Sequence, residues 1–369
     1  MKNYFKPVEL WFKRQFFRAT RPFFRRGRTS LAGFDPSTVR KVLFIRPERI
    51  GDMVVSLPAF EAVRLRFPKA QLALLASPRS VNLVEGDPRL DTVYVYHKNL
   101  SDIPVLRRIR AERYDVVLDM IHGDSVTSLV YSQLAAPKAL SLGVGKVRHA
   151  DFYDFNAIPG DVRREHIVDA TLRALAPLGI KPEECNGFVA PYLKPEAVKR
   201  AQSFVESVRR DPTRPLFGVN LSAGQPNRIW PTEKFATLVR RLLKIELRPY
   251  VIVTMDPRDR ARGEEVTSGL SEDVALVPKS LDLIDVSAII AQLDLLITPD
   301  TSLVHIARSF RVPVVGLYNG AYRNLYLWQP YRQPEGVVVS PHIDLIADIT
   351  VDQVVERVTS VVATERQRT

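Results

Sequence analysis

Short runs of apolar residues alternate with amphipathic segments along most of the chain. In its first part we expect strands at 41–45, 71–76, 92–96 and 114–120, and helices at about 53–66 and 102–112. Residues 135–160 show no clear period, so we expect them to be irregular. Strands that alternate with helices in this way predict a parallel, doubly wound sheet.

A second series follows helices predicted at 166–178 and 195–208 and a break at 209–215. It contains strands at 216–221, 250–255, 274–278, 293–297 and 312–317, and helices at 231–245, 259–270, 282–292, 302–310 and 351–362. Two series predict two Rossmann-like domains, at 39–190 and 191–369. Because open α/β sheets bind ligands beyond the carboxyl ends of their strands, we expect the domains to face a central cleft.

The composition is that of a globular protein, with 46% hydrophobic and 25% charged residues in 369. No apolar stretch is long enough for a transmembrane helix, and the N-terminus lacks an export signal. Cys185 is the only cysteine, which fits a reducing compartment. We therefore expect a cytoplasmic protein.

The positive charge is concentrated before the first domain, in an extension at 1–38. Residues 1–28 hold nine basic and one acidic side chain, a net charge of +8 out of +12 for the chain, together with eight aromatic residues. Leu10, Phe17 and Phe24 are spaced by seven, which favours an amphipathic helix. Such a helix would bind an anionic membrane surface or pack on the protein itself, and a nucleic-acid-binding arm is a further alternative.

The first candidate site is the segment 46–52, between the first strand and the first helix. Gly51 allows a close backbone approach or a positive φ. Asp52 is either the N-cap of the helix or a general base that accepts the proton of an attacking hydroxyl. Arg46 and Arg49 are either solvated surface charges or the binding site of an anionic acceptor.

The second candidate site is the loop 220–231, after the first strand of the second domain. Its small residues let backbone N–H groups approach a phosphate, and Ser222 adds a hydroxyl. Arg228 offers a bidentate cation for a leaving diphosphate. The alternative is an ordinary connection with an exposed arginine.

The third candidate site is the segment 298–307, which follows an apolar strand and opens a helix. A helix N-terminus with the hydroxyls of Thr301 and Ser302 is a natural diphosphate site, and His305 lies one turn further on. The carboxylate of Asp300 would repel a diphosphate, so we expect it to cap the helix or to bind a sugar hydroxyl. The alternative for His305 is a buried core histidine. Asp256 and Asp259 are weaker nucleotide candidates, with helix capping as the alternative.

Several common motifs are absent from the sequence. It has no Asp-x-Asp metal motif, Cys/His cluster or P-loop lysine motif, and the first strand is not followed by the dinucleotide-binding glycine pattern. We therefore expect neither a metal nor a cofactor. A departing diphosphate would be stabilised by cations and helix N-termini instead.

The motifs at 49–52, 56–59, 114–119, 222–231 and 298–307, in this order, resemble glycosyltransferase family 9, the ADP-heptose:lipopolysaccharide heptosyltransferases. The resemblance implies a GT-B fold and an inverting transfer of heptose from ADP-heptose to the lipopolysaccharide inner core. It also implies a peripheral location on the inner face of the cytoplasmic membrane.

Carried over by match, Asp52 is the implied base, and the implied donor residues are Arg228, Asp300, Thr301, Ser302 and His305. Ser222, a donor candidate through its hydroxyl, lies in the same matched loop as Arg228. Arg228 stands where several members have lysine, the segment 317–320 replaces an ending in Gly-Pro, and Pro47 and Glu48 differ from the usual small polar residues. The same fold using another nucleotide sugar on a core or surface glycan is the alternative.

Overall fold

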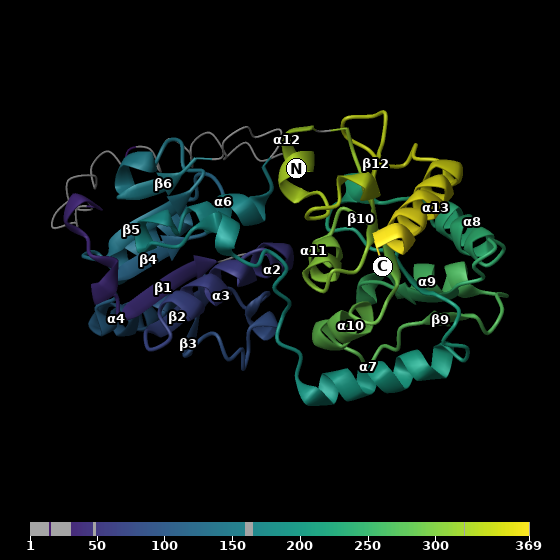
Figure 1. The fold of residues 1–369 in the computed structure, drawn as a ribbon, viewed down its shortest axis with the longest axis horizontal. Coiled ribbons are helices and arrows are strands. Elements are labelled where there is room, and N and C mark those ends of the chain that lie inside the picture. Colours follow the sequence, from purple (N-terminus) through teal and green to yellow (C-terminus); the bar gives the residue numbers. More distant parts are fainter. Residues whose placement is uncertain (1–14, 16–30, 47–48, 159–164, 321, 369) are drawn as a thin grey trace. The chain divides into compact units, whose positions relative to one another are not determined.

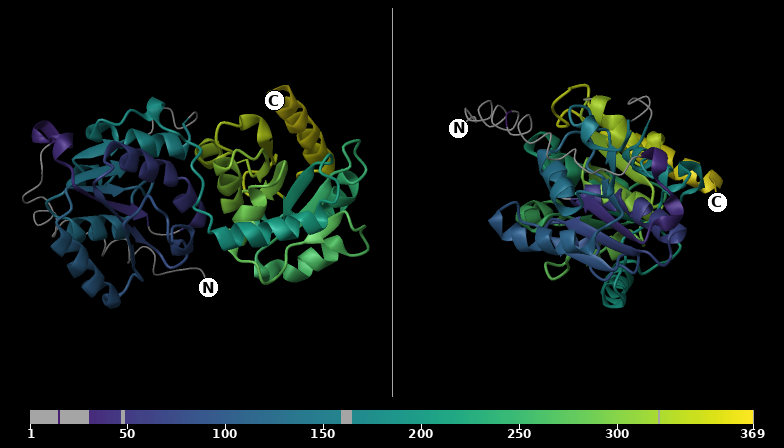
Figure 2. Two further views of the ribbon diagram at one scale, coloured as in Figure 1. Left: turned by 60° about the horizontal axis from the view of Figure 1, so that its bottom comes forward. Right: turned by 90° about the vertical axis from the view of Figure 1, so that its left-hand side faces the viewer.

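The computed structural model describes residues 15, 31–46, 49–158, 165–320 and 322–368. Their internal contacts divide the chain into two compact units (Figures 1 and 2). The first unit comprises Met1–Arg49, Pro58–Pro159 and Asp169–Cys185, and the second comprises Ile50–Leu57, Gly160–Val168 and Asn186–Thr369. The helix predicted within residues 1–28 lies outside the described residues, apart from Gln15.

The described strands of the first unit form a six-stranded parallel sheet in the order β3-β2-β1-β4-β5-β6. Its strands are β1 (Lys41–Arg46), β2 (Gln71–Ala76), β3 (Thr92–Val95), β4 (Val116–Asp119), β5 (Leu140–Val144) and β6 (Phe155–Ala157). The helices of this part of the chain are α2 (Ile50–Val54), α3 (Leu57–Arg66), α4 (Ile103–Glu112), α5 (Val126–Ala135) and α6 (Ile167–Arg173).

The second unit repeats this topology, with a described sheet in the order β12-β11-β10-β7-β8-β9, again parallel throughout. Its strands are β7 (Leu216–Asn220), β8 (Tyr250–Thr254), β9 (Val274–Leu276), β10 (Leu295–Pro299), β11 (Val314–Tyr318) and β12 (Val337–Val339). Its helices are α7 (Pro195–Val208), α8 (Thr232–Leu242), α9 (Arg260–Thr267), α10 (Leu283–Ile290), α11 (Ser302–Ser309), α12 (Tyr322–Trp328) and α13 (Val351–Arg368).

Each sheet thus has the Rossmann strand order, in which the chain starts at a central strand and winds first to one edge and then to the other. The two Rossmann-like units predicted from the sequence are confirmed. Strands buried on both faces explain why the sequence carries near-continuous apolar runs at these positions. Among the described residues, no helix is both long and apolar enough to cross a membrane.

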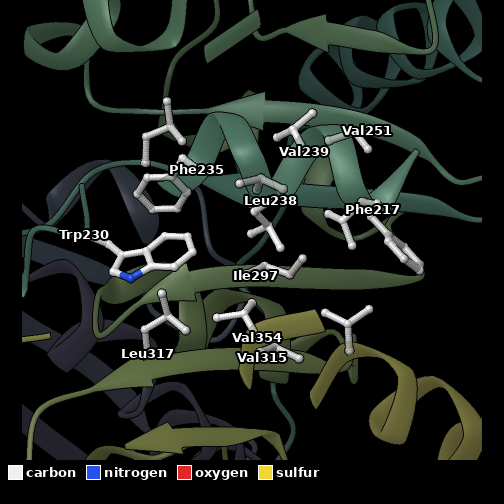
Figure 3. Close-up of a cluster of buried hydrophobic side chains, with 14 of the residues drawn as sticks. Phe217, Trp230, Phe235, Leu238, Val239, Val251, Ile297, Val315, Leu317 and Val354 are labelled. Carbon is white, nitrogen blue, oxygen red and sulfur yellow. The ribbon is translucent and has the colours of Figure 1, made fainter. Parts of the chain in front are cut away.

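The core of the second unit shows how the loop after β7 is anchored (Figure 3). Trp230 is fully buried against Phe235, with ring centroids 4.8 Å apart and the planes perpendicular, and its indole N–H donates to the carbonyl of Ile349 at 2.9 Å. A buried indole with a satisfied N–H stabilises its surroundings by a few kcal/mol, about 1.5–3 for the apolar burial alone. This anchor fixes the end of the loop that carries Arg228.

The structure corrects three details of the sequence interpretation. Residues 135–160 are not irregular, because they contain β5 and β6. The helix expected at 53–66 is broken between α2 and α3, since Pro58 has no N–H to donate to the turn before it. Residues Ile50–Leu57, which we placed in the N-terminal domain at 39–190, group with the second unit because α2 packs on α11.

Candidate functional site

The polar segments that follow β7, β10 and β11 leave the second sheet at the same edge. β10 pairs with both β7 and β11, and all three strands are parallel. The residues after Asn220, Pro299 and Tyr318 therefore lie where open α/β sheets bind ligands. The predicted donor residues at 222–228 and 300–305 are gathered in this one place.

Helix α11 begins here with a regular cap. Thr301 is its N-cap and accepts the N–H of Leu303 at 3.3 Å, so the capping role expected of Asp300 falls to Thr301. Ser302 is the first residue of the helix and His305 lies one turn later, as the spacing predicted. The N–H groups of a first turn and the helix dipole together favour an anion at this end.

Asn220, the last residue of β7, connects the two loops of the site. Its buried amide donates to the Thr298 hydroxyl at 2.8 Å and to the carbonyl of Ser222 at 3.1 Å. The Thr298 hydroxyl lies 3.1 Å from that of Thr301. The sequence interpretation quoted Asn220 without giving it a role. The signal was its place at the end of an apolar strand, directly before the loop.

Arg228 and Asp300 form an ion pair that the sequence did not predict. A guanidinium nitrogen of Arg228 lies 2.8 Å from the Asp300 carboxylate and 3.3 Å from its carbonyl oxygen. Both side chains are partly exposed. The pair neutralises a carboxylate that would otherwise repel an anion at the start of α11. The planar guanidinium has further N–H groups that can bind a phosphate.

The Ser222 hydroxyl holds the loop after β8 in place. It donates to the Asp259 carboxylate at 2.6 Å and accepts the N–H of Asp256 at 2.7 Å. Asp256 in turn caps the short helix Pro257–Asp259. A phosphate bound by this hydroxyl would therefore replace its bond to Asp259. The capping alternative for Asp256 is the arrangement that the structure shows.

Arg262 fixes the backbone of the same site. Its guanidinium donates to the carbonyls of Leu221 and Trp230 at 3.3 and 3.0 Å, and it lies 3.5 Å from Asp259. Both ends of the Arg228 loop are thus tied to one side chain. Sequence reasoning missed Arg262, since nothing in its helical position indicates which backbone it reaches.

Helix α2, which contains Asp52, packs on α11 within the second unit, and Gly51 makes the contact with the first turn of α11. A Cβ at Gly51 would lie 3.1 Å from Cδ2 of His305 and 3.4 Å from Cα of Ser302, so Gly51 provides the close approach and not a positive φ. Asp52, the next residue, is half-buried and lies in the first turn of α2. It is the third residue of the helix, so it is not the N-cap.

The His305 ring is buried among other aromatic side chains. It contacts Trp328 and His166 at centroid distances of 5.6 and 6.1 Å, and His166 also packs on Tyr331 at 4.9 Å. The His166 ring accepts the N–H of Val168 and lies 3.0 Å from the carbonyl of Gln329. Burial, with the neighbouring His305, lowers the pKa of His166 to about 3, so its ring is neutral. His166 was not identified from the sequence.

A small cavity lies beside this cluster within the second unit. It is lined by side chains of α2 and α11 and by His166, Val189 and Tyr331. Tyr318, at the end of β11, is also buried near the Arg228–Asp300 pair. Burial, assisted by the Asp300 charge, raises the pKa of Tyr318, so its hydroxyl stays a neutral donor to the carbonyl of Trp328.

The predicted acceptor arginines belong to the first unit. Arg46 ends the central strand β1, and Arg49 is exposed. Pro47 and Glu48, between them, lie outside the described residues. Arg46 is thus at the carboxyl end of a central strand and Arg49 comes shortly after it, the position that the topology favours for a ligand.

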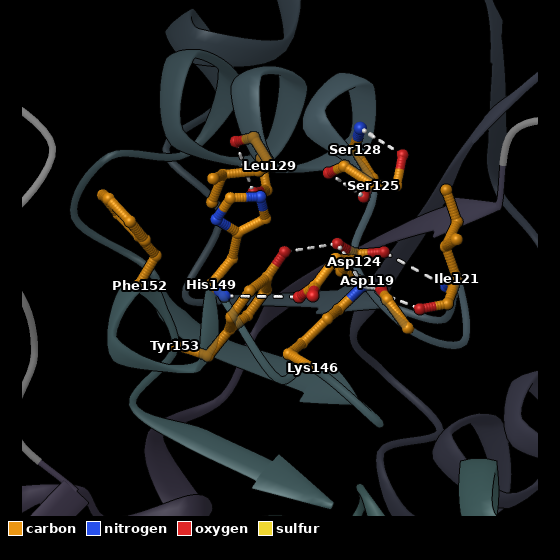
Figure 4. A network of polar contacts seen from close by, with 12 residues as sticks. Asp119, Ile121, Asp124, Ser125, Ser128, Leu129, Lys146, His149, Phe152 and Tyr153 are labelled. Carbon is orange, nitrogen blue, oxygen red and sulfur yellow. Dashed lines mark hydrogen bonds and ion pairs between the residues drawn. The ribbon is translucent and has the colours of Figure 1, made fainter. Parts of the chain in front are cut away.

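A buried ion pair lies at the same edge of the first sheet and was not predicted (Figure 4). The Lys146 ammonium is 2.9 Å from the Asp119 carboxylate and donates to the carbonyls of Ile121 and Gly123 at 2.7 and 3.1 Å. Both charged side chains are almost fully buried, and Asp119 also accepts the Tyr153 hydroxyl. The ammonium is thus fully hydrogen-bonded, as a buried charge requires.

Among the described residues, no group of three or more His, Cys, Asp or Glu side chains is arranged to hold a metal ion.

Two solved structures share this architecture. The glycosyl transferase family 9 protein from Veillonella parvula DSM 2008 superposes with a TM-score of 0.75 at 19% identity, over 90% of this chain and 98% of that one. The E. coli heptosyltransferase WaaC with ADP gives 0.66 at 17% identity, over 87% and 97%. Together with the two Rossmann-like sheets, they define this as a protein of the GT-B fold class.

The sequence comparisons identify the family. Lipopolysaccharide heptosyltransferase 3 of Escherichia coli (strain K12) is 22% identical over 302 residues, which cover 77% of this chain and 83% of that protein. The model of glycosyltransferase family 9 (heptosyltransferase) matches residues 104–351. The chain therefore belongs to glycosyltransferase family 9, and it is a glycosyltransferase enzyme.

Proposed function

We propose that the chain transfers a heptose from ADP-heptose to the lipopolysaccharide inner core by a single, inverting displacement. The observation that carries this proposal is the packing of α2 on the first turn of α11, with Gly51 directly against His305 and Ser302. Because Asp52 directly follows Gly51 in α2, this packing supports the proposal that its carboxylate acts near the helix start that best fits a diphosphate. Support for the donor and the acceptor comes from the names of the relatives, which include a lipopolysaccharide heptosyltransferase and a heptosyltransferase with ADP.

The donor diphosphate would lie at the start of α11, near Thr301 and Ser302. There the first-turn N–H groups and the guanidinium of Arg228 would share its negative charge. The ion pair with Asp300 already holds the guanidinium of Arg228 in place. The arginine side chain is therefore pre-oriented and does not have to be ordered when the nucleotide binds. His305, which lies one turn after Ser302 in α11, would fix the position of Ser302.

In the reaction, a hydroxyl oxygen of the acceptor attacks the anomeric carbon of the heptose. The hydroxyl proton passes to Asp52, the bond between that carbon and the phosphate oxygen breaks, and ADP departs with the electron pair. Arg228 and the α11 N–H groups would stabilise the departing charge without a metal ion. One new glycosidic bond replaces one glycosyl phosphate bond, so the step is balanced.

The acceptor would be recognised by the first unit. Arg46 ends β1 and Arg49 comes shortly after it, and two cations at this place suit an acidic or phosphorylated sugar. We propose that the basic segment 1–28 holds the enzyme at the inner face of the cytoplasmic membrane, where a lipid-linked acceptor lies. No part of this proposal involves nucleic acid.

Calorimetric titration with ADP, UDP and GDP, followed by a transfer assay with ADP-heptose and a Kdo-containing lipid A acceptor, tests the proposal. We expect ADP to bind at least tenfold more tightly than UDP or GDP, and the transfer rate to be unchanged by EDTA. Tight UDP binding without ADP binding would contradict the heptose assignment and favour another nucleotide sugar. Transfer that stops with EDTA and returns with Mg²⁺ would contradict the metal-independent stabilisation.

A further inference from the structure

Two apolar side chains project from the first unit at the start of α4. Leu100, on the short helix Leu100–Asp102, is 82% exposed, and Ile103, the first residue of α4, is 42% exposed. The inward face of α4 is satisfied, since Ile109, Val105 and Leu106 pack in the core of this unit. The side chains of Leu100 and Ile103 are therefore not part of the apolar core of this unit.

The loop that presents Leu100 is held in one conformation. The carboxylate of Asp102, which is 2% exposed, accepts the N–H groups of His97 and Lys98 at 2.7 and 2.8 Å and the hydroxyl of Tyr131. Asn99 adds a capping box with Asp102. Lys98 has φ +62°, a conformation that costs a non-glycine residue free energy. Leu100 is thus exposed on a loop that several hydrogen bonds to buried Asp102 hold in place.

The exposed side of α4 is cationic. Arg107, Arg110 and Arg113 are exposed, and Arg108 lies over the Tyr94 ring at 5.6 Å. The acid of the helix, Glu112, is paired with Lys41 at 2.8 Å. An apolar tip followed by arginines suits an interface that is apolar inside and negative at its surface, which is the chemistry of an anionic lipid bilayer.

The tip lies at the ligand-binding edge of the first sheet. Residues 96–102 follow β3, and all described strands of this sheet are parallel, so the tip is at the same edge as the carboxyl ends of β1 and β4. Helix α4 connects β3 to the parallel strand β4 and so runs back from that edge, which places Arg107 and Arg110 further from the edge than the tip. A ligand bound beyond the carboxyl end of β1 would thus lie at the same edge of the first sheet as the tip.

We propose that Leu100 and Ile103, with Arg107 and Arg110, form a membrane-docking surface that binds anionic phospholipid. The proposal concerns these four residues and is independent of the role proposed for residues 1–28. The proposal does not rest on the assignment of the donor or of the acceptor sugar. It predicts that Leu100 enters the interfacial layer of a bilayer while the arginines contact the headgroups.

The direct test places an environment-sensitive dye on a cysteine at position 100. The full chain carries Cys185→Ser and Leu100→Cys, and is mixed with vesicles of phosphatidylcholine, alone or with an equal amount of phosphatidylglycerol. We expect the dye emission to rise severalfold and shift to the blue with the anionic vesicles only. Unchanged emission at position 100 would overturn the proposal, even if the chain binds vesicles through another segment.

The matched control is Leu65→Cys in the same Cys185→Ser background. Leu65 is 75% exposed and lies between Arg64 and Arg66, but near the end of α3, at the opposite edge of the same sheet. We expect its dye to stay unchanged with both kinds of vesicle. An equal response at positions 65 and 100 would show non-specific adsorption and would overturn the proposal.

A second variant measures how much the charges of Arg107 and Arg110 contribute to vesicle binding. Since each arginine near an anionic surface contributes about fivefold in affinity, Arg107→Glu with Arg110→Glu should weaken vesicle binding by about 25-fold or more. Solution transfer to a delipidated acceptor should stay unchanged. If Leu100→Glu instead disperses a dimer seen by light scattering and leaves vesicle binding unchanged, the surface binds a second copy of the chain and the lipid proposal is wrong.

Discussion

Gly51 lies directly against the ring of His305, so close that a methyl group on Gly51 would come within 3.1 Å of Cδ2. The two residues are 254 positions apart, and their contact joins the helix that carries Asp52 to the helix that begins the donor site. The glycine of the 49–52 motif is therefore explained by packing. A larger residue would separate the two helices.

We predict that Gly51→Ala destabilises the protein by about 1–3 kcal/mol, because the added methyl group would press on the buried His305 ring and on the backbone of Ser302. It should also lower kcat, since Asp52 moves with α2. Chemical unfolding and a transfer assay measure the two effects. The control is Gly33→Ala, where an added Cβ has nothing within 4 Å. Equal stability of the two variants would contradict the close packing.

The Arg228–Asp300 pair predicts non-additive effects on nucleotide binding. Arg228→Ala should weaken ADP binding by about tenfold to a hundredfold, because a charged hydrogen bond is lost and the Asp300 carboxylate is left beside the diphosphate. Adding Asp300→Ala should restore part of the affinity. Calorimetry on the two single variants and the double variant measures the coupling.

The exposed Arg258→Ala is the control, and it should leave ADP binding unchanged. If the double variant shows only the sum of the two single effects, the two side chains do not act on the ligand as a pair.

Breaking the buried Lys146–Asp119 pair should be costly. Lys146→Met leaves the Asp119 carboxylate buried without its cation, and we expect a loss of about 3–5 kcal/mol in the free energy of unfolding. Lys146→Met with Asp119→Leu should recover part of that loss. Lys181→Met, at the exposed pair with Glu184, should change little. If Lys146→Met unfolds at the same urea concentration as the wild type, the buried ion pair does not contribute the stability that we predict.

His166 predicts a dependence of stability on pH. Its pKa is about 3 in the folded protein, against 6.5 for an ordinary histidine, mainly because the ring is buried. Between these values the unfolded chain binds a proton that the folded protein does not, so stability is present above pH 6.5 and falls as the pH drops towards 3.

We expect His166→Gln to flatten this dependence between pH 7 and 5, by up to about 1.4 kcal/mol per pH unit. Urea unfolding at several pH values measures the slope. If the free energy of unfolding changes with pH equally in the variant and the wild type, His166 does not set the pH dependence.

Most of the fold could be predicted because buried parallel strands are continuous apolar runs. Strand β2 and helix α7 have the predicted bounds. Strand β5 was missed because Ser141 and Gly143 interrupt its apolar character, although Ser141 is buried and bonded to Asp154. Ser141 is buried because β5 pairs with its neighbouring strands, and the local sequence does not show this pairing.

The candidate site could be predicted only where its residues are close in sequence. The segment 298–305 was found because a helix start follows an apolar strand. Lys146 meets Asp119 only because β4 pairs with β5, and His166 reaches His305 only through the fold of the second unit. Such meetings depend on tertiary structure, and the spacing in one sequence does not encode them.

The central claim is that Asp52 removes the proton of the acceptor hydroxyl. The measurement that tests it most directly is kcat for Asp52→Asn, with ADP affinity and unfolding measured on the same sample. The control is Glu196→Gln, at an exposed position of α7. We predict that kcat falls by about a hundredfold to ten-thousandfold, while ADP binding and stability stay near wild type. A kcat within a few fold of wild type, or a loss explained by unfolding or by lost ADP binding, would contradict the claim.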